Sequence, residues 1–152
     1  MKKFKFSLDA VLSYKEQILD ALQSEHAEIL GNIRQQEDRL KDLKEAYQAY
    51  GQEYQERCAA GLSITEVLAY QASLRARETE LQQEALRLRQ LQQQEAAKRE
   101  EVLAARTETA SMEKLQEKQL QAYRVEEAKR EEQRIEEFVV TSRTVRSEEN
   151  AS

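Results

Sequence analysis

Two long stripes of mostly apolar residues, with members alternately three and four positions apart, run through the chain on either side of Gly61. The first extends from Leu8 to Tyr54 and the second from Val67 to Met112; each has fourteen positions, of which eleven and nine are apolar. This spacing keeps the side chains of a stripe on one face of an α-helix, which is the pattern of a coiled coil. The sequence therefore predicts two long helices, each with one apolar face that needs a partner.

The two stripes match each other when the chain is folded back at Leu62. Opposed positions then have residue numbers that add to 124, so that Tyr54 faces Tyr70 and Leu12 faces Met112. Every a position meets a d position, as antiparallel helices require. Beyond Met112 the same spacing meets one apolar residue in seven positions. We therefore predict an all-α fold, with two long helices in an antiparallel coiled-coil hairpin and an overhanging C-terminal helix.

Capping residues mark the ends of the predicted helices. The Ser7 hydroxyl is placed to accept a hydrogen bond from the first turn, and Gly61 is suited to the left-handed conformation that ends a helix. Ser63 followed by Glu66 forms the capping box typical of a helix start. The last residues are polar and charged, as in disordered tails. We predict a single domain over 1–140, with a helix over 7–60, a turn over 61–63 and a helix over 64–140, followed by a disordered tail over 141–152.

The composition excludes several classes of protein. With 35% charged residues, three glycines and no proline among 152 residues, the chain cannot fill a two-layer globular core. The formal net charge of -5 argues against binding to nucleic acid, which requires a basic face. No segment approaches the roughly 20 apolar residues of a membrane span. Cys58 is the only cysteine and forms no internal disulfide, so we predict a protein of the cytoplasm.

No set of residues predicts catalysis, and we expect a non-enzymatic protein without cofactor or metal. A pair of helices offers no enclosed pocket in which reacting groups converge. His26, the only histidine, faces Lys98 across the predicted seam. We interpret it as a polar layer that fixes the register rather than as a ligand. Similar polar layers interrupt the seam elsewhere, and the alternative interpretation is that they leave the helix pair free to twist or bend.

Aromatic residues gather at two places on the predicted hairpin. Tyr47, Tyr50, Tyr54 and Tyr70 lie near the turn, where their rings either cover the narrow end of the helix pair or form a surface for a partner. At the other end, apolar residues off the seam or on the overhang indicate that this end enters another protein. These residues are Phe4, Phe6, Val11, Ile18, Leu120, Tyr123, Ile135 and Phe138.

Four parts of the sequence are similar to a known family. They are the opening FKFSLDAVLSYKE, the segment EDRLKDLKEAYQAYGQEY, the turn GLSI followed by AYQ at 69–71, and a charged C-terminal helix ending in EEFVV. Together they resemble FliJ of the bacterial flagellar export apparatus over nearly the whole chain. The resemblance implies a component of a type III secretion system whose antiparallel coiled coil is similar to the central stalk of rotary ATPases.

The resemblance also implies partners. Members of the family associate with the hexameric flagellar export ATPase and stimulate it, bind the cytoplasmic domain of the export gate, and help to cycle export chaperones. By analogy, the ATPase-binding residues of this chain are Phe4, Phe6, Leu8, Val11, Leu12, Leu120, Tyr123 and Phe138.

For the export gate, the resemblance implies binding through Leu43, Tyr47 and Tyr50. The second helix departs from the family pattern, because bulkier or less acidic residues are expected at Ser73, Arg77, Glu80 and Glu84. The family also implies a cytoplasmic location, peripheral at the cytoplasmic face of the inner membrane. Two alternatives stay open: a structural coiled-coil scaffold dimer without an ATPase partner, and the equivalent stalk of a virulence-type secretion system.

Overall fold

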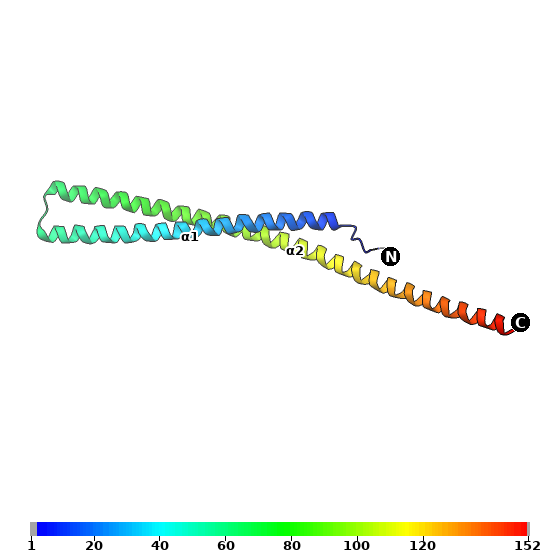
Figure 1. The fold of residues 1–152 in the computed structure, drawn as a ribbon. Coiled ribbons are helices and arrows are strands. Elements are labelled where there is room, and N and C mark those ends of the chain that lie inside the picture. Colours follow the sequence, from blue (N-terminus) through cyan, green and yellow to red (C-terminus); the bar gives the residue numbers. More distant parts are fainter. Residues whose placement is uncertain (1–2, 152) are drawn as a thin grey trace. The chain divides into compact units, whose positions relative to one another are not determined.

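The protein consists of two long helices in the computed structural model, which describes residues 3–151. Helix α1 spans Asp9–Ala60 and helix α2 spans Ile64–Ala151 (Figure 1). No strand occurs among residues 3–151. The predicted all-α fold class with two long helices is confirmed.

Three residues connect the helices and carry capping interactions. Gly61 has a φ of 102°, a left-handed conformation that glycine adopts without strain. Its N–H donates to the Cys58 carbonyl at 3.3 Å. On the other side of the turn, the Ser63 hydroxyl accepts a hydrogen bond from the Glu66 N–H at 3.2 Å. These bonds satisfy backbone groups that the ends of α1 and α2 would otherwise leave unpaired.

The N-terminal segment enters α1 through a turn. We expected the helix to begin at residue 7, whereas α1 begins at Asp9, whose N–H donates to the Phe6 carbonyl at 3.1 Å. The Leu12 N–H then donates to the Leu8 carbonyl at 2.9 Å. The turn before Asp9 accounts for the difference, which has the size common at helix ends.

The C-terminal stretch also differs from the expectation. We predicted a helix ending at 140 and a disordered tail over 141–152, but α2 continues to Ala151. The hydroxyls of Thr141, Thr144 and Ser147 donate to carbonyls four residues earlier, at 2.8, 2.9 and 2.9 Å. No proline or glycine follows Gly61 in the sequence, so nothing breaks the backbone ladder. Residues 1, 2 and 152 of the predicted ranges lie outside the described residues.

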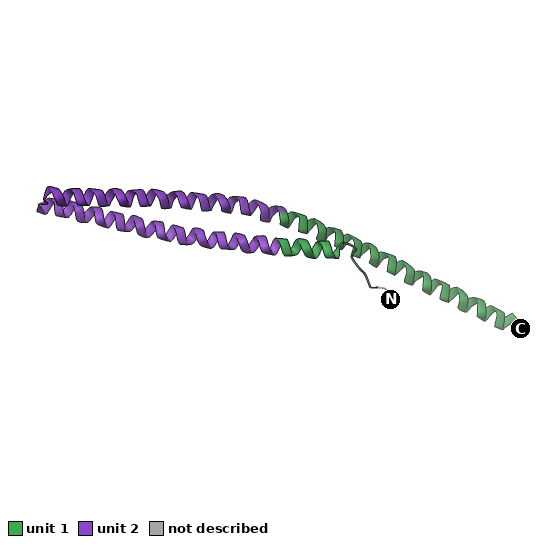
Figure 2. Ribbon diagram, turned by 90° about the horizontal axis from the view of Figure 1, so that it is seen from above, with its two compact units in different colours: residues 1–18, 105–152 green, residues 19–104 purple. Residues whose placement is uncertain are grey.

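The structure divides into two compact units (Figure 2), and the single domain over 1–140 stays a prediction. Unit 1 contains residues 1–18 and 105–152, and unit 2 contains residues 19–104. The reason is physical, because each residue of a helix pair contacts only the nearby layers of the other helix. Stretches that are far apart along the helices therefore share no core.

In unit 2, α1 packs against α2 through a seam of apolar and polar side chains. Leu40, Tyr70 and Val102 are buried, and so is Gln36. The Tyr70 ring lies 5.3 Å from the Tyr54 ring, so the predicted layer of these two tyrosines is present. The contacts in this unit are consistent with helices that run antiparallel.

In unit 1, the start of α1 packs against the C-terminal part of α2. Phe6, Leu12 and Thr109 are buried, with exposed fractions of 7, 5 and 3%. Lys15 Nζ lies 3.0 Å from the Glu108 carboxylate. The Thr109 hydroxyl donates to the carbonyl four residues earlier at 2.8 Å, so this buried hydroxyl is satisfied within its own helix.

Candidate functional site

The residues predicted to bind the ATPase all lie in unit 1, and the structure separates them by exposure. Phe6 and Leu12 are buried. Leu8, Val11 and Phe138 are exposed by 37, 42 and 72%. Of these five side chains, the three exposed ones present apolar surface that another protein reaches without opening the packing of unit 1.

The other three residues of this set, Phe4, Leu120 and Tyr123, are half-buried. The ring centroids of Phe4 and Tyr123 are 5.5 Å apart and the ring planes are inclined at 47°, a tilted contact that aromatic pairs favour. Two phenylalanines thus anchor the segment before α1: Phe4 contacts Tyr123, and Phe6 is buried in the core of unit 1. Beside it lies a hollow of about 370 Å³ lined by Phe4, Lys5, Phe6, Asp9 and Gln116.

Apolar side chains near the end of α2 extend the predicted set. Ile135, Val139 and Val145 are exposed by 59, 40 and 49%. Phe138 and Val139 each lie next to Ile135 on the helix surface, because spacings of three and four residues place helical side chains next to each other. The sequence interpretation missed Val139 and Val145. For Val145, helical spacing that continues past residue 140 was the signal that would have found it.

The residues predicted to bind the export gate lie on α1 in unit 2. Leu43, Tyr47 and Tyr50 are half-buried. The Tyr50 ring lies 5.2 Å from the Tyr70 ring, and the Arg77 guanidinium lies 4.4 Å from the Tyr50 ring centroid. A cation over an aromatic face is attracted to its π electrons. Tyr50 is therefore already engaged by two residues of α2.

Two tyrosine hydroxyls in this region donate to carboxylates. The Tyr47 hydroxyl donates to Glu78 at 2.5 Å, and the Tyr70 hydroxyl donates to Glu53 at 3.4 Å. The hydrogen bond to Glu78 raises the pKa of Tyr47, and burial raises the pKa of Tyr70. Both hydroxyls therefore remain protonated donors at neutral pH.

The polar layer predicted at His26 has a different partner in the structure. His26 Nε2 lies 3.0 Å from Glu95 Oε1. Lys98, the residue expected to face His26, pairs with Glu25 of α1 at 2.8 Å and with Glu101 of α2 at 2.9 Å. His26 thus contacts the carboxylate of Glu95, and Lys98 links the two helices through its own ion pair with Glu25.

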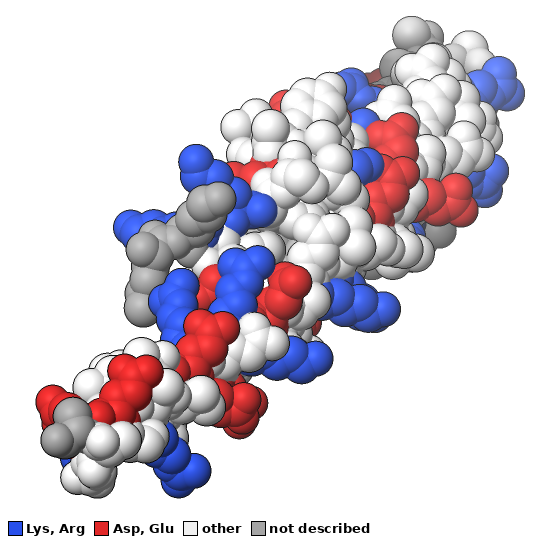
Figure 3. Space-filling model, turned by 90° about the vertical axis from the view of Figure 1, so that its right-hand side faces the viewer, with Lys and Arg blue, Asp and Glu red and all other residues white. Residues whose placement is uncertain are grey.

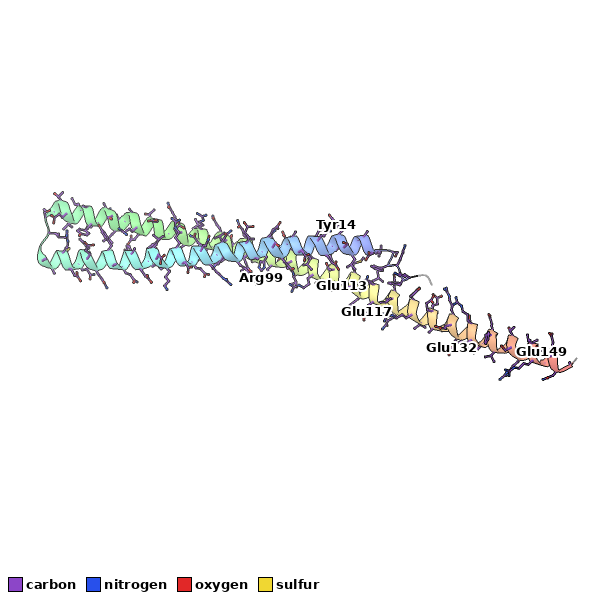
Figure 4. All side chains as sticks on the ribbon, viewed as in Figure 1. Tyr14, Arg99, Glu113, Glu117, Glu132 and Glu149 are labelled. Carbon is purple, nitrogen blue, oxygen red and sulfur yellow. The ribbon has the colours of Figure 1, made fainter. Side chains whose placement is uncertain are left out.

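Glu95 extends this network to Arg99, which Figure 4 labels on α2. Arg99 donates from Nε and Nη2 to the two Glu95 carboxylate oxygens at 3.0 and 2.6 Å. Hydrogen bonds from Arg99, and then from His26, hold the pKa of Glu95 at about 2. The carboxylate is therefore ionised at neutral pH and connects α2 to α1 through His26.

A second polar layer lies at Gln36, whose side chain is 6% exposed. Its amide donates to the Glu84 carbonyl at 3.0 Å and also to the Glu84 carboxylate. Arg39 approaches the same carboxylate at 3.3 Å. The amide nitrogen of Gln36 thus donates twice to one residue of α2, which links the helices at a defined register.

The described side chains show no grouping typical of metal chemistry. Within residues 3–151, no three His, Cys, Asp or Glu side chains are placed to hold a metal ion. No helix in the described part of the chain is long and apolar enough to cross a membrane. Figure 3 shows basic and acidic side chains interleaved on the face that it displays. A mixed surface of this kind favours pairing between individual side chains over general attraction to a polyanion.

Comparison with known proteins gives one match. The family model described as Flagellar FliJ protein matches residues 4–148. No curated protein and no solved structure matches the chain. The matched range covers α1, the turn and nearly all of α2.

Proposed function

The chain belongs to the flagellar FliJ family, and from this premise we propose that it binds the hexameric flagellar export ATPase as a stalk and stimulates it. Family membership makes the protein a component of the flagellar protein export apparatus. One observation carries the proposal of ATPase binding, namely the apolar surface that unit 1 leaves in water. Leu8, Val11 and Phe138 are all substantially exposed, and apolar surface of this kind is stabilised when a partner covers it.

The eight residues of the predicted site take two roles in this proposal. Leu8, Val11 and Phe138 contact the ATPase. Phe6 and Leu12 are buried and position the exposed residues that precede or follow them in sequence. Phe4, Leu120 and Tyr123 hold the N-terminal segment against α2, supported by the ring contact between Phe4 and Tyr123.

The stalk in this proposal is an antiparallel coiled-coil hairpin with an overhanging C-terminal helix. Contacts between α1 and α2 within each unit support it, such as Lys15 with Glu108 in unit 1 and Tyr54 with Tyr70 in unit 2. The protein has no catalytic activity of its own in this scheme. It acts in the cytoplasm, at the cytoplasmic face of the inner membrane.

We further propose that Leu43, Tyr47 and Tyr50 contact the cytoplasmic domain of the export gate, and that the protein also binds export chaperones. The contacts of Arg77 and Glu78 with these tyrosines make the surface partly polar. A gate surface that binds it therefore needs hydrogen-bonding groups as well as apolar ones.

The test is a titration of the purified chain into its cognate export ATPase, with ATP turnover as the readout. We expect stimulation that saturates near one chain per hexamer. The double variant Leu8→Glu and Phe138→Glu should lose the stimulation and keep the helical circular dichroism of the parent. A matched control, Leu68→Glu with Leu86→Glu, changes two side chains of unit 2 that are 59 and 56% exposed. It should stimulate normally.

Two outcomes would overturn the proposal. One is unchanged turnover with no co-migration of the two proteins. The other is equal loss of stimulation in both double variants. A mass near twice 17.7 kDa by light scattering would instead favour the alternative of a coiled-coil scaffold dimer.

A further inference from the structure

Arg77 of α2 differs from the other arginines of the chain in its surroundings. All the arginines lie within residues 3–151, and among them Arg77 alone is half-buried while the rest are exposed. Its guanidinium carbon lies 4.4 Å from the centroid of the Tyr50 ring. The Tyr50 ring in turn lies 5.2 Å from the Tyr70 ring. The Arg77 side chain is therefore held against the tyrosines of unit 2 rather than extended into solvent.

The Arg77 guanidinium has no carboxylate partner within the chain. Arg99 is paired with Glu95 at 2.6 Å, whereas among residues 3–151 the structure gives Arg77 no ion pair and no side-chain hydrogen bond. Glu80 lies three positions further along α2, a spacing at which charged side chains can pair on a helix. The contact with the Tyr50 ring is formed in place of that pair.

The acidic residues closest to these tyrosines bind other groups. The Glu78 carboxylate accepts a hydrogen bond from the Tyr47 hydroxyl at 2.5 Å, and the Glu53 carboxylate accepts one from the Tyr70 hydroxyl at 3.4 Å. Neither of these two carboxylates forms an ion pair with Arg77. The surface that includes Tyr47 and Tyr50 therefore carries a cation without a matching anion.

The hydrogen-bonding groups of Arg77 are accessible to a partner. Half-burial removes part of the water that stabilises a charged group, and the Tyr50 ring compensates for some of this loss. A ring offers no oxygen acceptor to the five N–H donors of a guanidinium. Within residues 3–151, every buried side-chain nitrogen or oxygen has a hydrogen-bond partner, so the unpaired N–H groups of Arg77 reach solvent. Another protein can contact them without opening the packing of unit 2.

We propose that Arg77 determines which partner this surface accepts, by binding a carboxylate side chain of the export gate. The inference rests on the proposed contact of Leu43, Tyr47 and Tyr50 with the gate. A carboxylate matches the planar fork of a guanidinium, to which it binds through two parallel hydrogen bonds. The contact with Tyr50 restricts the guanidinium before the partner arrives, which lowers the entropy lost in forming the pair.

The same arrangement discriminates against other partners. A protein surface with an apolar or basic residue at this place would cover the Arg77 guanidinium and supply no acceptor. A charged group that loses its water without gaining a hydrogen bond weakens the complex. Selection at Arg77 therefore depends on the charge of the partner, whereas Tyr47 and Tyr50 contribute aromatic surface to any partner that fits.

The test measures binding of the full chain to the purified cytoplasmic domain of the cognate export gate by isothermal titration calorimetry. Arg77→Met keeps an unbranched side chain beside Tyr50 and removes the charge, and it should weaken binding about tenfold or more. Arg77→Glu should weaken binding further, because two carboxylates repel each other. The matched control is Arg75→Glu, at an exposed arginine two positions earlier, which should bind as the parent does.

Three outcomes would overturn the role of Arg77 alone. They are parent-like binding of Arg77→Met, equal binding of Arg77→Met and Arg77→Glu, and equal weakening by Arg77→Glu and Arg75→Glu. Tyr47→Ala separates this inference from the proposed gate contact, since a loss of binding in Tyr47→Ala beside parent-like Arg77→Met leaves the gate contact in place. If the parent does not bind the gate domain, the gate contact and the role of Arg77 both fail.

Discussion

Unit 1 and unit 2 are built from the same two helices but leave different amounts of apolar surface in water. Among the described residues, eleven exposed large hydrophobic side chains lie in unit 1 and five in unit 2, although unit 2 is the longer unit. Among residues 3–151, contacts between charged or histidine side chains that join the two helices are more numerous in unit 2, with three, than in unit 1, with one. Unit 2 thus directs its specific contacts inward, and unit 1 keeps apolar groups available for other proteins.

The largest expected effect tests whether a few buried side chains hold unit 1 together. Leu12 is 5% exposed, and we expect Leu12→Ala to lower the free energy of unfolding by about 2–4 kcal/mol through lost burial and the cavity left behind. Urea unfolding followed by circular dichroism measures this. The neighbouring variant Val11→Ala, at an exposed position, should cost less than about 1 kcal/mol. If both variants lost the same free energy of unfolding, the difference in exposure between Leu12 and Val11 would not reflect a difference in their contribution to stability.

A smaller effect is expected in the seam of unit 2. Gln36→Leu removes the amide that donates to the Glu84 carbonyl and carboxylate, and a buried acceptor left without its donor costs about 1–2 kcal/mol. The exposed neighbour provides the control as Gln35→Leu, which should be nearly neutral. A Gln36→Leu protein more stable than the parent would show that unit 2, like unit 1, depends mainly on apolar burial.

The third prediction concerns the stability of the folded chain at acid pH. The pKa of Glu95 is about 2 in the folded chain against an ordinary value of 4.5. The stabilisation from this carboxylate is therefore complete above about pH 4.5 and is lost as the pH falls toward 2. Melting temperatures over this range should fall less steeply for Glu95→Gln than for the parent. Glu113→Gln, a change at an exposed residue of unit 1 labelled in Figure 4, should keep the slope of the parent.

The smallest effect is expected at the ion pair that joins the helices of unit 1. The side chains of Lys15 and Glu108 are 30 and 65% exposed, so solvent screens their attraction. Lys15→Gln should shift the melting temperature by less than about 3 °C, and high salt should remove the difference. A larger shift in melting temperature that persists in high salt would mean that the stability of unit 1 depends on this ion pair as much as the stability of unit 2 depends on its polar contacts.

Local chemistry made the turn and one layer of the seam predictable. Gly61 and Ser63 are residue types whose backbone preferences act within a few positions, and both have the conformation or bond that their types favour. The pairing of Tyr54 with Tyr70 followed from heptad spacing on both sides of the turn. In each case the signal was either close in sequence or repeated many times along the chain.

The partners of the polar side chains were not predictable in the same way. Heptad spacing placed His26 opposite Lys98, but long charged side chains reach across more than one layer. His26 therefore contacts Glu95, and Lys98 reaches Glu25. Spacing selects the layer, whereas the choice among neighbouring acids depends on rotamers and on the other charges nearby.

The sequence pattern also did not predict which residues of the candidate site are buried and which are exposed. Phe6 lies before the first helical residue, where helical periodicity does not apply, and it is buried while Leu8 is 37% exposed. The extent of α2 was missed for a different reason. The polar and charged stretch after residue 140 was interpreted as a disordered tail, but the Thr141 hydroxyl donates to the backbone of its own helix, and the helix continues to Ala151.

The turn at Gly61 has a consequence for how the chain folds. Contacts between α1 and α2 link residues that are progressively farther apart in sequence: Tyr70 and Glu53 by 17 positions, Gln36 and Glu84 by 48, and Lys15 and Glu108 by 93. The entropy lost in closing a loop grows with its length, so the contacts beside the turn form at the lowest cost. Each contact shortens the loop that the next one must close. Pairing therefore spreads outward from Gly61, which makes the contacts of the two chain ends the last to form and the first to open.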